Sequence, residues 1–492
     1  MDIVLYPRVA PSDRLRIWLG IFQATMAPAL AWSINGAPVA PVALRQLASV
    51  RPDAMLPAGA QPETVARAFT GVYEFPGLTP DTFYTITAEA EASRATLETR
   101  TLPTAVPTEL DRWFNVLLVS CFHQAEDRKG LAGIIASQLR AVVRPHLTLL
   151  MGDQVYLDLP TLQDFPDDLA WLAGKFEDDY AHNWRGSVGY PHILAAAPSL
   201  SVPDDHEYWN NYPHPSPFVG NSLQPEGRAR WQQAAQAMYE GFQLAHPHIL
   251  GEPVLVEVEP LSFFVADTRS RRAADRSFFL PESGHLQMEA WVATVIAKKQ
   301  IGVFVTGQSL FTQTAGEIAG AIGDYTLPNY QDYERLMRCL QRLADAGRPT
   351  LCLTGDVHWG RVVTSTDIRT GRIAFTEVIS SPTSLVTTIG RDQITQIGDF
   401  FSDLFGPKNP WPRHADPDDP PEFLASEVLQ GRFRCFTAHR QKGNHLALLR
   451  FRQHGSGLEL RVTYWPITRD ARVATPIHLR EIYLLSAEEN RP

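Results

Sequence analysis

The chain has 492 residues, more than one hydrophobic core usually organises, so we expect two or three domains. Its 44% hydrophobic and 20% charged residues are ordinary for a globular protein. A net charge of −10 argues against nucleic acid as a stable partner and against an anionic membrane surface, because both require a basic protein surface.

Cysteine content and the first residues bear on the compartment. Four cysteines are too few for a disulfide scaffold. The sequence has no run of about 18 apolar residues, so we expect no transmembrane segment. Residues 1–7 lack the basic and then apolar pattern of a signal peptide. We therefore expect a cytoplasmic protein, or a periplasmic or secreted one if a targeting segment has been removed.

Residues 1–105 predict a small N-terminal β-sandwich domain. Short β-rich runs alternate with Pro, Gly and Asp, and no helical period of any length is present. Residues 78–87 resemble the turn and strand that carry the tyrosine corner of fibronectin type III and immunoglobulin-like sandwiches, with Tyr84 as the corner residue. Because no reactive side chains gather here, we expect this domain to pack against and shield the next one.

Residues 106–492 predict a single α/β catalytic domain. Buried strands at 115–120 and 147–150 flank a helix around 131–139, which is a βαβ unit and requires parallel pairing. Further strands and helices alternate along the chain: strands at 199–203, 261–266, 302–306 and 350–354, and helices at 167–184, 226–245, 284–299 and 330–346. The segments at 157–198 and 406–421 are expected to set specificity, and the tail from residue 433 is expected to add antiparallel strands.

Four of these strands end in side chains that bind metal ions in proteins. The pairs are Cys121 and His123, Asp153 and Tyr156, Asp205 and His206, and Asp356 and His358. In open α/β sheets, ligands bind at the carboxyl edge of the strands. Carboxylates that converge there would repel one another unless cations lay among them. The sequence therefore predicts a metal centre at this edge.

The types of ligand indicate which metals and which chemistry to expect. A thiolate and a phenolate, Cys121 and Tyr156, favour Fe³⁺, whereas a set of oxygen ligands suits Ca²⁺, Mg²⁺ or Mn²⁺. If Asp153 bridged two ions about 3.5–4 Å apart, a bridging hydroxide could attack phosphorus in line. His206, beside Asp205, would then be placed to protonate the leaving oxygen.

The order of the motifs resembles the PhoD family of alkaline phosphatases and phosphodiesterases, in the calcineurin-like metallophosphoesterase superfamily. The resemblance covers residues 115–385. It rests on Ser-Cys at 120–121, Gly-Asp-x-x-Tyr at 152–156, Asp-Asp-His-Glu at 204–207, Asp-Thr-Arg-x-x-Arg at 267–272 and Gly-Asp-Val-His at 355–358. It implies a four-layer α/β/β/α catalytic domain, preceded by the sandwich.

The resemblance also implies a cofactor of Fe³⁺ and Ca²⁺, with Mn²⁺, Mg²⁺ or Zn²⁺ as alternatives. It further implies roles for individual residues. The metal ligands are Cys121, Asp153, Tyr156, Asp205, Asp356 and His358. The catalytic residues are His206 and Asp205. Asn210, Asn211, Arg269 and Arg272 are candidates for binding substrate, although a structural role is slightly favoured for the two arginines. Whether His123 is a ligand stays open.

The predicted function is hydrolysis of a small phosphate ester by a metal-dependent enzyme, a phosphodiesterase or an alkaline phosphatase. The sequence does not distinguish a monoester from a diester substrate, and it does not define the oligomeric state. The alternative is a catalytically inactive scaffold that retains a metallophosphatase-like fold and binds a partner. The intact set of strand-end ligands argues against this alternative, because a degenerate site would have lost several of them.

Overall fold

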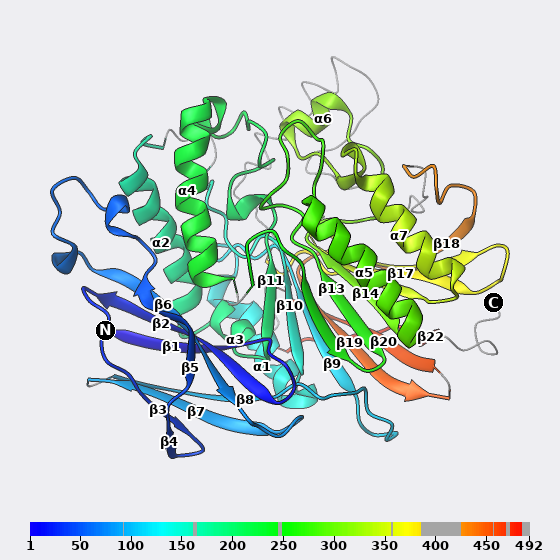
Figure 1. Cartoon of the computed structure of the whole chain (residues 1–492), viewed down its shortest axis with the longest axis horizontal. Helices are drawn as coiled ribbons and strands as arrows, with labels where there is room; N and C mark the ends of the chain where they lie inside the picture. Colours follow the sequence, from blue (N-terminus) through cyan, green and yellow to red (C-terminus); the bar gives the residue numbers. More distant parts are fainter. Residues whose placement is uncertain are drawn as a thin grey trace.

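The computed structural model describes residues 1–91, 93–160, 165–244, 248–355, 358–384, 425–455, 457–468 and 473–484. Two large sheets lie face to face, and helices cover their outer faces (Figure 1). The predicted loop at 406–421 lies outside the described residues. Across the described ranges, no helix has the length and apolar character needed to cross a membrane.

The first sheet has eleven strands in the described part of the chain, with the predicted βαβ unit at its centre. β9 (Phe114–Val119), β10 (Leu147–Met151) and β11 (Ser199–Val202) run parallel, and every residue in them is buried. Largely apolar runs suit strands that are covered on both faces. The flanking strands are β19 (His445–His454), β20 (Gly457–Pro466), β21 (Ile477–His478) and β22 (Ile482–Leu484) on one side, and β1 (Asp2–Arg8), β2 (Arg14–Ala24), β6 (Arg67–Pro76) and β5 (Val42–Ser49) on the other.

The second sheet has seven described strands. Its four central strands are parallel: β13 (Leu261–Val265), β14 (Ile301–Thr306), β15 (Thr350–Thr354) and β17 (Ile373–Ile379). Antiparallel strands complete it: β12 (Val254–Val258), β16 (Gly360–Asp367) and β18 (Phe433–Gln441). Apolar side chains from both sheets form one buried cluster between them, which fixes the two sheets against each other.

Helices form the two outer layers and confirm the predicted mixed α/β class. On the first sheet, α1 (Leu131–Val143), α2 (Leu169–Arg185), α3 (Tyr190–Leu194) and α4 (Pro225–Phe242) share one hydrophobic cluster. On the second sheet, α5 (Glu282–Lys298) and α7 (Tyr333–Asp345) share another, and the short α6 (Glu317–Ile322) lies in the loop between β14 and α7. The layers therefore follow the order helix, sheet, sheet, helix.

The N-terminal strands are joined to the first sheet, which the sequence did not predict. β1 pairs in parallel with β11, so β1, β2, β6 and β5 extend the first sheet. A separate sheet of β3 (Ala31–Ile34), β4 (Ala37–Val39), β7 (Phe83–Ala90) and β8 (Ser93–Arg100) shares a hydrophobic cluster with them. The Tyr84 hydroxyl accepts a hydrogen bond from the Thr79 backbone N–H at 2.9 Å, as expected for a tyrosine corner. A domain boundary at residue 105 stays a prediction.

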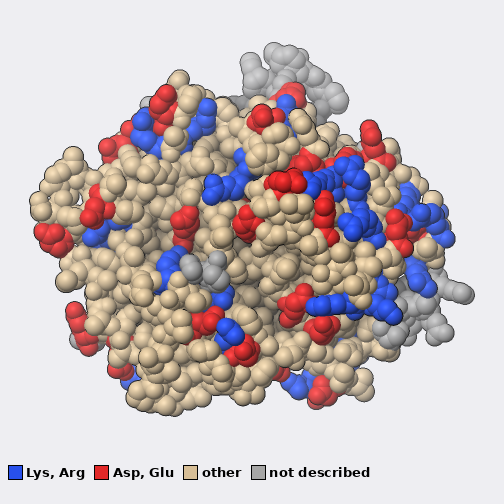
Figure 2. Space-filling model, in the orientation of Figure 1, with Lys and Arg blue, Asp and Glu red and all other residues tan. Residues whose placement is uncertain are grey.

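Charged side chains of both signs are interspersed over the face shown in Figure 2. This mixture agrees with the ordinary charged fraction of the sequence and differs from the one-sided basic surface that nucleic-acid binding requires. The absence of nucleic acid as a stable partner stays a prediction.

Candidate metal centre

The predicted ligands lie where the two sheets meet at the carboxyl ends of their strands. Cys121 and Asp153 follow the neighbouring parallel strands β9 and β10, and His358 lies four residues after β15 of the other sheet. The two sheets approach closely here. A Cβ atom on Gly355 would lie 2.1 Å from the Met151 carbonyl oxygen, so only glycine allows this approach.

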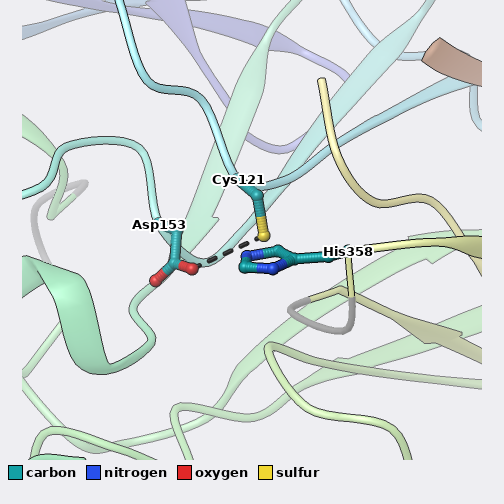
Figure 3. A group of neighbouring side chains, drawn as sticks. All are labelled: Cys121, Asp153 and His358. Atoms are coloured by element: carbon teal, nitrogen blue, oxygen red, sulfur yellow. Dashed lines mark hydrogen bonds between the residues drawn. The ribbon is translucent and has the colours of Figure 1, made fainter. Parts of the chain in front are cut away.

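The side chains form two groups. Within each group, the candidate ligand atoms all lie within 4.8 Å of one another. The first contains Cys121, Asp153 and His358, and the second contains Asp153, Asp205 and His206. In Figure 3 the Cys121 and Asp153 side chains point toward each other beside the His358 ring, and the distance from Sγ to Oδ2 is 3.4 Å. Because Asp153 belongs to both groups, it is the residue positioned to bridge two metal ions.

All three members of the first group have a strained backbone. The φ angles of Cys121, Asp153 and His358 are 53°, 57° and 57°, in the left-handed region that non-glycine residues rarely adopt. Such conformations cost about 1–3 kcal/mol each and cluster at functional sites. The rest of the fold therefore holds these three side chains in place against a local preference.

The electrostatics of the centre favour a bound cation. Asp153 is fully buried, and this burial, followed by the nearby Cys121 and Asp205, raises its pKa well above the usual range. Burial likewise raises the pKa of Asp205 to about 6. Ionising both carboxylates without a counter-charge would be costly, whereas a metal ion between them would favour the ionised form. The thiol, carboxylate and imidazole donors thus fit a metal centre.

His206 is held by an aspartate that the sequence analysis missed. Its Nδ1 lies 2.8 and 3.0 Å from the two carboxylate oxygens of Asp158, which is fully buried. Burial disfavours the charged imidazole, but Asp158 and Asp205 outweigh it and raise the pKa of His206 to about 9. Asp158 also accepts the Asn210 backbone N–H at 2.8 Å. The only sequence signal for Asp158 was its place in the segment that follows Asp153.

Glu207 organises the backbone around the shared ligand. Its carboxylate accepts the backbone N–H groups of Asp153, Gln154 and Asp204 at 2.9, 2.7 and 2.9 Å. It is fully buried, and this burial raises its pKa to about 7. The sequence placed Glu207 in the acidic cluster at 204–207 but did not indicate this role, because its partners include a loop more than 50 residues away.

Two aromatic side chains complete the surroundings. The Tyr156 ring lies 4.3 Å from the His206 ring and 5.5 Å from the His123 ring, measured between centroids. His123 belongs to neither ligand group within the described residues, and burial lowers its pKa. Metal coordination by Tyr156 stays a prediction. Asp356, predicted as a ligand, lies outside the described residues.

Arg269 is fully engaged with protein groups. Its guanidinium donates to Asp204 Oδ1 at 2.7 Å, to the Tyr212 carbonyl oxygen at 2.8 Å and to Asp324 Oδ2 at 2.6 Å, and its side chain has no exposed surface. These contacts join the loop after β11 to the loop after β14. They favour the structural role that the sequence analysis preferred.

Arg272 is equally enclosed. It donates to the Thr268 carbonyl oxygen at 2.9 Å and to Gln308 Oε1 at 2.7 Å, and its guanidinium lies 4.9 Å from the centroid of the Tyr330 ring. Its side chain also has no exposed surface. A role in binding substrate therefore stays a prediction for which these contacts provide no support.

The two candidate asparagines both contact the segment around α6. Asn210 Nδ2 donates to the Gly323 carbonyl oxygen at 3.2 Å, and Asn211 Nδ2 donates to the Ala321 carbonyl oxygen at 3.4 Å. The Asn211 backbone N–H donates to Asp205 Oδ2 at 2.7 Å, which orients that carboxylate. Substrate binding by either asparagine stays a prediction.

Comparison with known proteins identifies solved structures with a similar fold. No protein-family profile and no curated protein matches the sequence. The solved structure of PhoD is similar over 99% of this chain and 92% of its own, with 13% identity and a TM-score of 0.62. Purple acid phosphatase PPD1 from yellow lupin (Lupinus luteus) seeds is similar over 97% of this chain and 74% of its own, with 12% identity and a TM-score of 0.56.

The chain therefore has the fold of the metallophosphoesterases. In particular, it is similar to PhoD over nearly its whole length, which confirms for the fold the resemblance that the sequence motifs indicated. At these identities the likeness concerns the fold, and the chemistry must be argued from the residues of the centre.

Proposed function

We propose that this protein is a metal-dependent phosphoric ester hydrolase, a phosphodiesterase or alkaline phosphatase. One observation carries the proposal: Asp153 is shared by two buried groups of ligands at the joined edge of two sheets. Two metal ions that share a carboxylate are a common device for in-line displacement at phosphorus. The PhoD-like fold supports this reading.

The donor sets differ between the two groups, so we assign different metals to them. Cys121, Asp153 and His358, with Tyr156 and Asp356 as further candidates, suit Fe³⁺ because a thiolate and a phenolate would then share one ion. The group that contains Asp205 suits Ca²⁺, with Mn²⁺, Mg²⁺ or Zn²⁺ as alternatives. Bound there, the metals would supply an activated water as nucleophile and would polarise the phosphoryl oxygen.

His206 is the residue that we assign as the acid for the leaving group. Asp158 occupies Nδ1, so Nε2 is the nitrogen that remains for a substrate. Asp158 and Asp205 raise the pKa of His206 and so favour the protonated imidazole that an acid requires. Within the second group we therefore assign Asp153 and Asp205 as the metal ligands and His206 as the acid. Asp205 contributes to this raised pKa and is itself oriented by the Asn211 backbone N–H.

The contacts of the two arginines bear on the substrate class. Free basic groups beside the centre would favour a dianionic monoester, but the two described candidates, Arg269 and Arg272, both donate to protein oxygens and have no exposed side-chain surface. This arrangement favours a small phosphodiester, which carries one charge fewer. The scaffold alternative gains no support, because the described ligands of both groups are intact.

The test is hydrolysis of a chromogenic phosphodiester and of the matching monoester, with Ca²⁺, Mn²⁺ or iron supplied. We expect turnover by the wild-type protein, a higher rate with the diester, and no turnover by Asp153→Asn. Asp178→Asn, a change at an exposed position on α2, is the matched control and should keep full activity. Full activity of Asp153→Asn would contradict the proposal.

A further inference from the structure

We propose that a pocket away from the metal centre, the arginine pocket, binds the phosphate group of a small molecule. It has a volume of about 270 Å³ and lies where β8 meets α1 and the end of α3. Its lining includes Phe83, Arg100, Arg140, Arg144 and His192. None of these residues belongs to the metal centre, so the inference does not depend on the proposed hydrolase activity.

The arginine pocket lies at the opposite end of the first sheet from the metal centre. Two prolines line the pocket: Pro145 lies two residues before β10, and Pro198 directly precedes β11. Asp153 and Asp205 follow the same two strands. The five residues of β10 span about 17 Å at the usual rise per residue. A ligand in this pocket therefore cannot touch the metal centre.

The pocket carries an excess of positive charge in an acidic protein. Among the described residues that line it, Glu98 is the only acidic one. Among the residues that the structure describes, no carboxylate oxygen lies within 4.0 Å of the guanidinium nitrogens of Arg140 or Arg144. Arg100 pairs with Asp81, but Asp81 also accepts from Arg112 at 2.5 Å. An anion in the pocket would supply the missing counter-charge.

Two of the guanidinium groups are held in place by one aromatic ring. The guanidinium carbons of Arg100 and Arg144 lie 4.8 and 5.1 Å from the centroid of Phe83. Arg144 ends α1 with φ 46°, a left-handed conformation for which helix ends usually use glycine. Arg140, one turn earlier, donates to the Glu98 carbonyl oxygen at 2.8 Å. The three side chains are therefore positioned before any ligand arrives.

The geometry indicates the class of ligand. Planar guanidinium groups match phosphate oxygens in pairs, which makes arginine the usual residue for recognising phosphate. The volume is just below the range of about 300–1,000 Å³ for small-molecule sites, so inorganic phosphate or a small organic phosphate fits and a polymer does not. Free phosphate and an organic phosphate share this chemistry.

The test is calorimetric titration of the full chain with inorganic phosphate and with phenylphosphonate, which cannot be hydrolysed as an ester. We compare the wild type with the double variant Arg140→Gln and Arg144→Gln. We expect the double variant to bind at this site at least tenfold more weakly, with unchanged hydrolase activity. Arg94→Gln is the matched control and should bind as the wild type does. Arg94 is an exposed arginine that pairs with Glu89, and it lies on β8, the strand that also carries Arg100.

The outcomes separate the alternatives. Tighter binding of phenylphosphonate than of phosphate would identify an organic phosphate as the ligand, and the reverse would identify the free ion. Asp153→Asn should keep the binding event, because the pocket lies away from the metal centre. Identical titrations of the wild type and the double variant, or equal affinity for malonate, would overturn the proposal.

A second measurement needs no variant and covers the case in which the double variant fails to fold. Phenylglyoxal modifies accessible arginines, and mass spectrometry locates the modified positions in the wild-type protein. We expect inorganic phosphate to slow modification of Arg140 and Arg144 at least fivefold while Arg94 reacts at an unchanged rate. Equal modification with and without phosphate would overturn the proposal.

Discussion

The buried Glu207 carboxylate accepts the backbone N–H of Asp153 at 2.9 Å, and so it holds the residue that both groups of candidate metal ligands share. The same carboxylate accepts backbone N–H groups from Gln154 and Asp204. One side chain therefore joins the loop after β10 to the loop after β11. Gln243, at the end of α4, donates to it at 3.1 Å and links this arrangement to the helical layer.

We expect Glu207→Gln to weaken metal binding. The amide NH₂ of glutamine would face a backbone N–H, which leaves buried donors unpaired at a cost of about 1–3 kcal/mol. The strained conformation of Asp153 would then lose part of its support. Metal content after dialysis should fall at least tenfold, and urea unfolding should show the loss of stability. Glu226→Gln, at an exposed position in the first turn of α4, is the control, and equal metal content in both variants would contradict the role.

Asp158→Asn should reduce turnover through His206. Asparagine has no carboxylate with which to hold Nδ1 of a protonated imidazole. Acid catalysis should therefore weaken, and kcat should fall about 10²–10⁴-fold. The loss should be large for a poor leaving group and small for a good one, because only the former needs a proton. Steady-state rates with a series of aryl phosphodiesters measure this, and a loss that is uniform across the series would rule out the assignment.

Arg269→Lys should destabilise the fold. Lysine cannot reach Asp204, Asp324 and the Tyr212 carbonyl oxygen together, and breaking a buried ion pair costs about 3–5 kcal/mol. Urea denaturation measures the effect, with the exposed neighbour Arg271→Lys as the control. If Arg269 instead bound substrate, the variant would keep its stability and show a raised KM.

Cys121→Ser should remove tightly bound iron. In the proposed iron site the Cys121 thiolate is a ligand together with Asp153 and His358, and a serine hydroxyl is a poor replacement for it. Iron per protein, measured by plasma mass spectrometry after purification, should fall below a tenth of the wild-type value. Cys435→Ser, at a half-buried position on β18, is the control. Iron retained in Cys121→Ser would show that another metal or ligand set operates.

His445 should contribute a loss of stability in mild acid. Burial lowers its pKa to about 4, whereas an unfolded histidine titrates near 6.5. Between these values the unfolded chain binds more protons, so stability is lost as the pH falls from about 6.5 toward 4. The loss amounts to about 3 kcal/mol. Urea unfolding at several pH values gives the free energy of unfolding as a function of pH. This free energy should depend less steeply on pH in His445→Gln than in the wild type, and identical slopes would contradict this prediction.

Local patterns in the sequence were enough to predict the central strands of the first sheet and several of the side chains that gather at their ends. The apolar runs that end at Cys121 and Asp153 form β9 and β10, and the helices around 226–245 and 284–299 form α4 and α5. These features were readable because strand burial, helical period and the residue that follows a strand are all encoded over a few neighbouring positions. The carboxyl edge of parallel strands then brings Cys121 and Asp153 together.

Only the tertiary structure decided which residues support these ligands. Asp158 meets His206 and Glu207 meets Asp153 across separations of 48 and 54 residues, and Arg269 meets Asp204 across 65. Contacts of this kind depend on how loops from different strands pack, and they leave no periodic trace in the sequence. The pairing of β1 with β11 was hidden for the same reason. The sequence by itself determined the strands and the polar side chains at their ends, whereas long-range packing determined the geometry that holds those side chains in place.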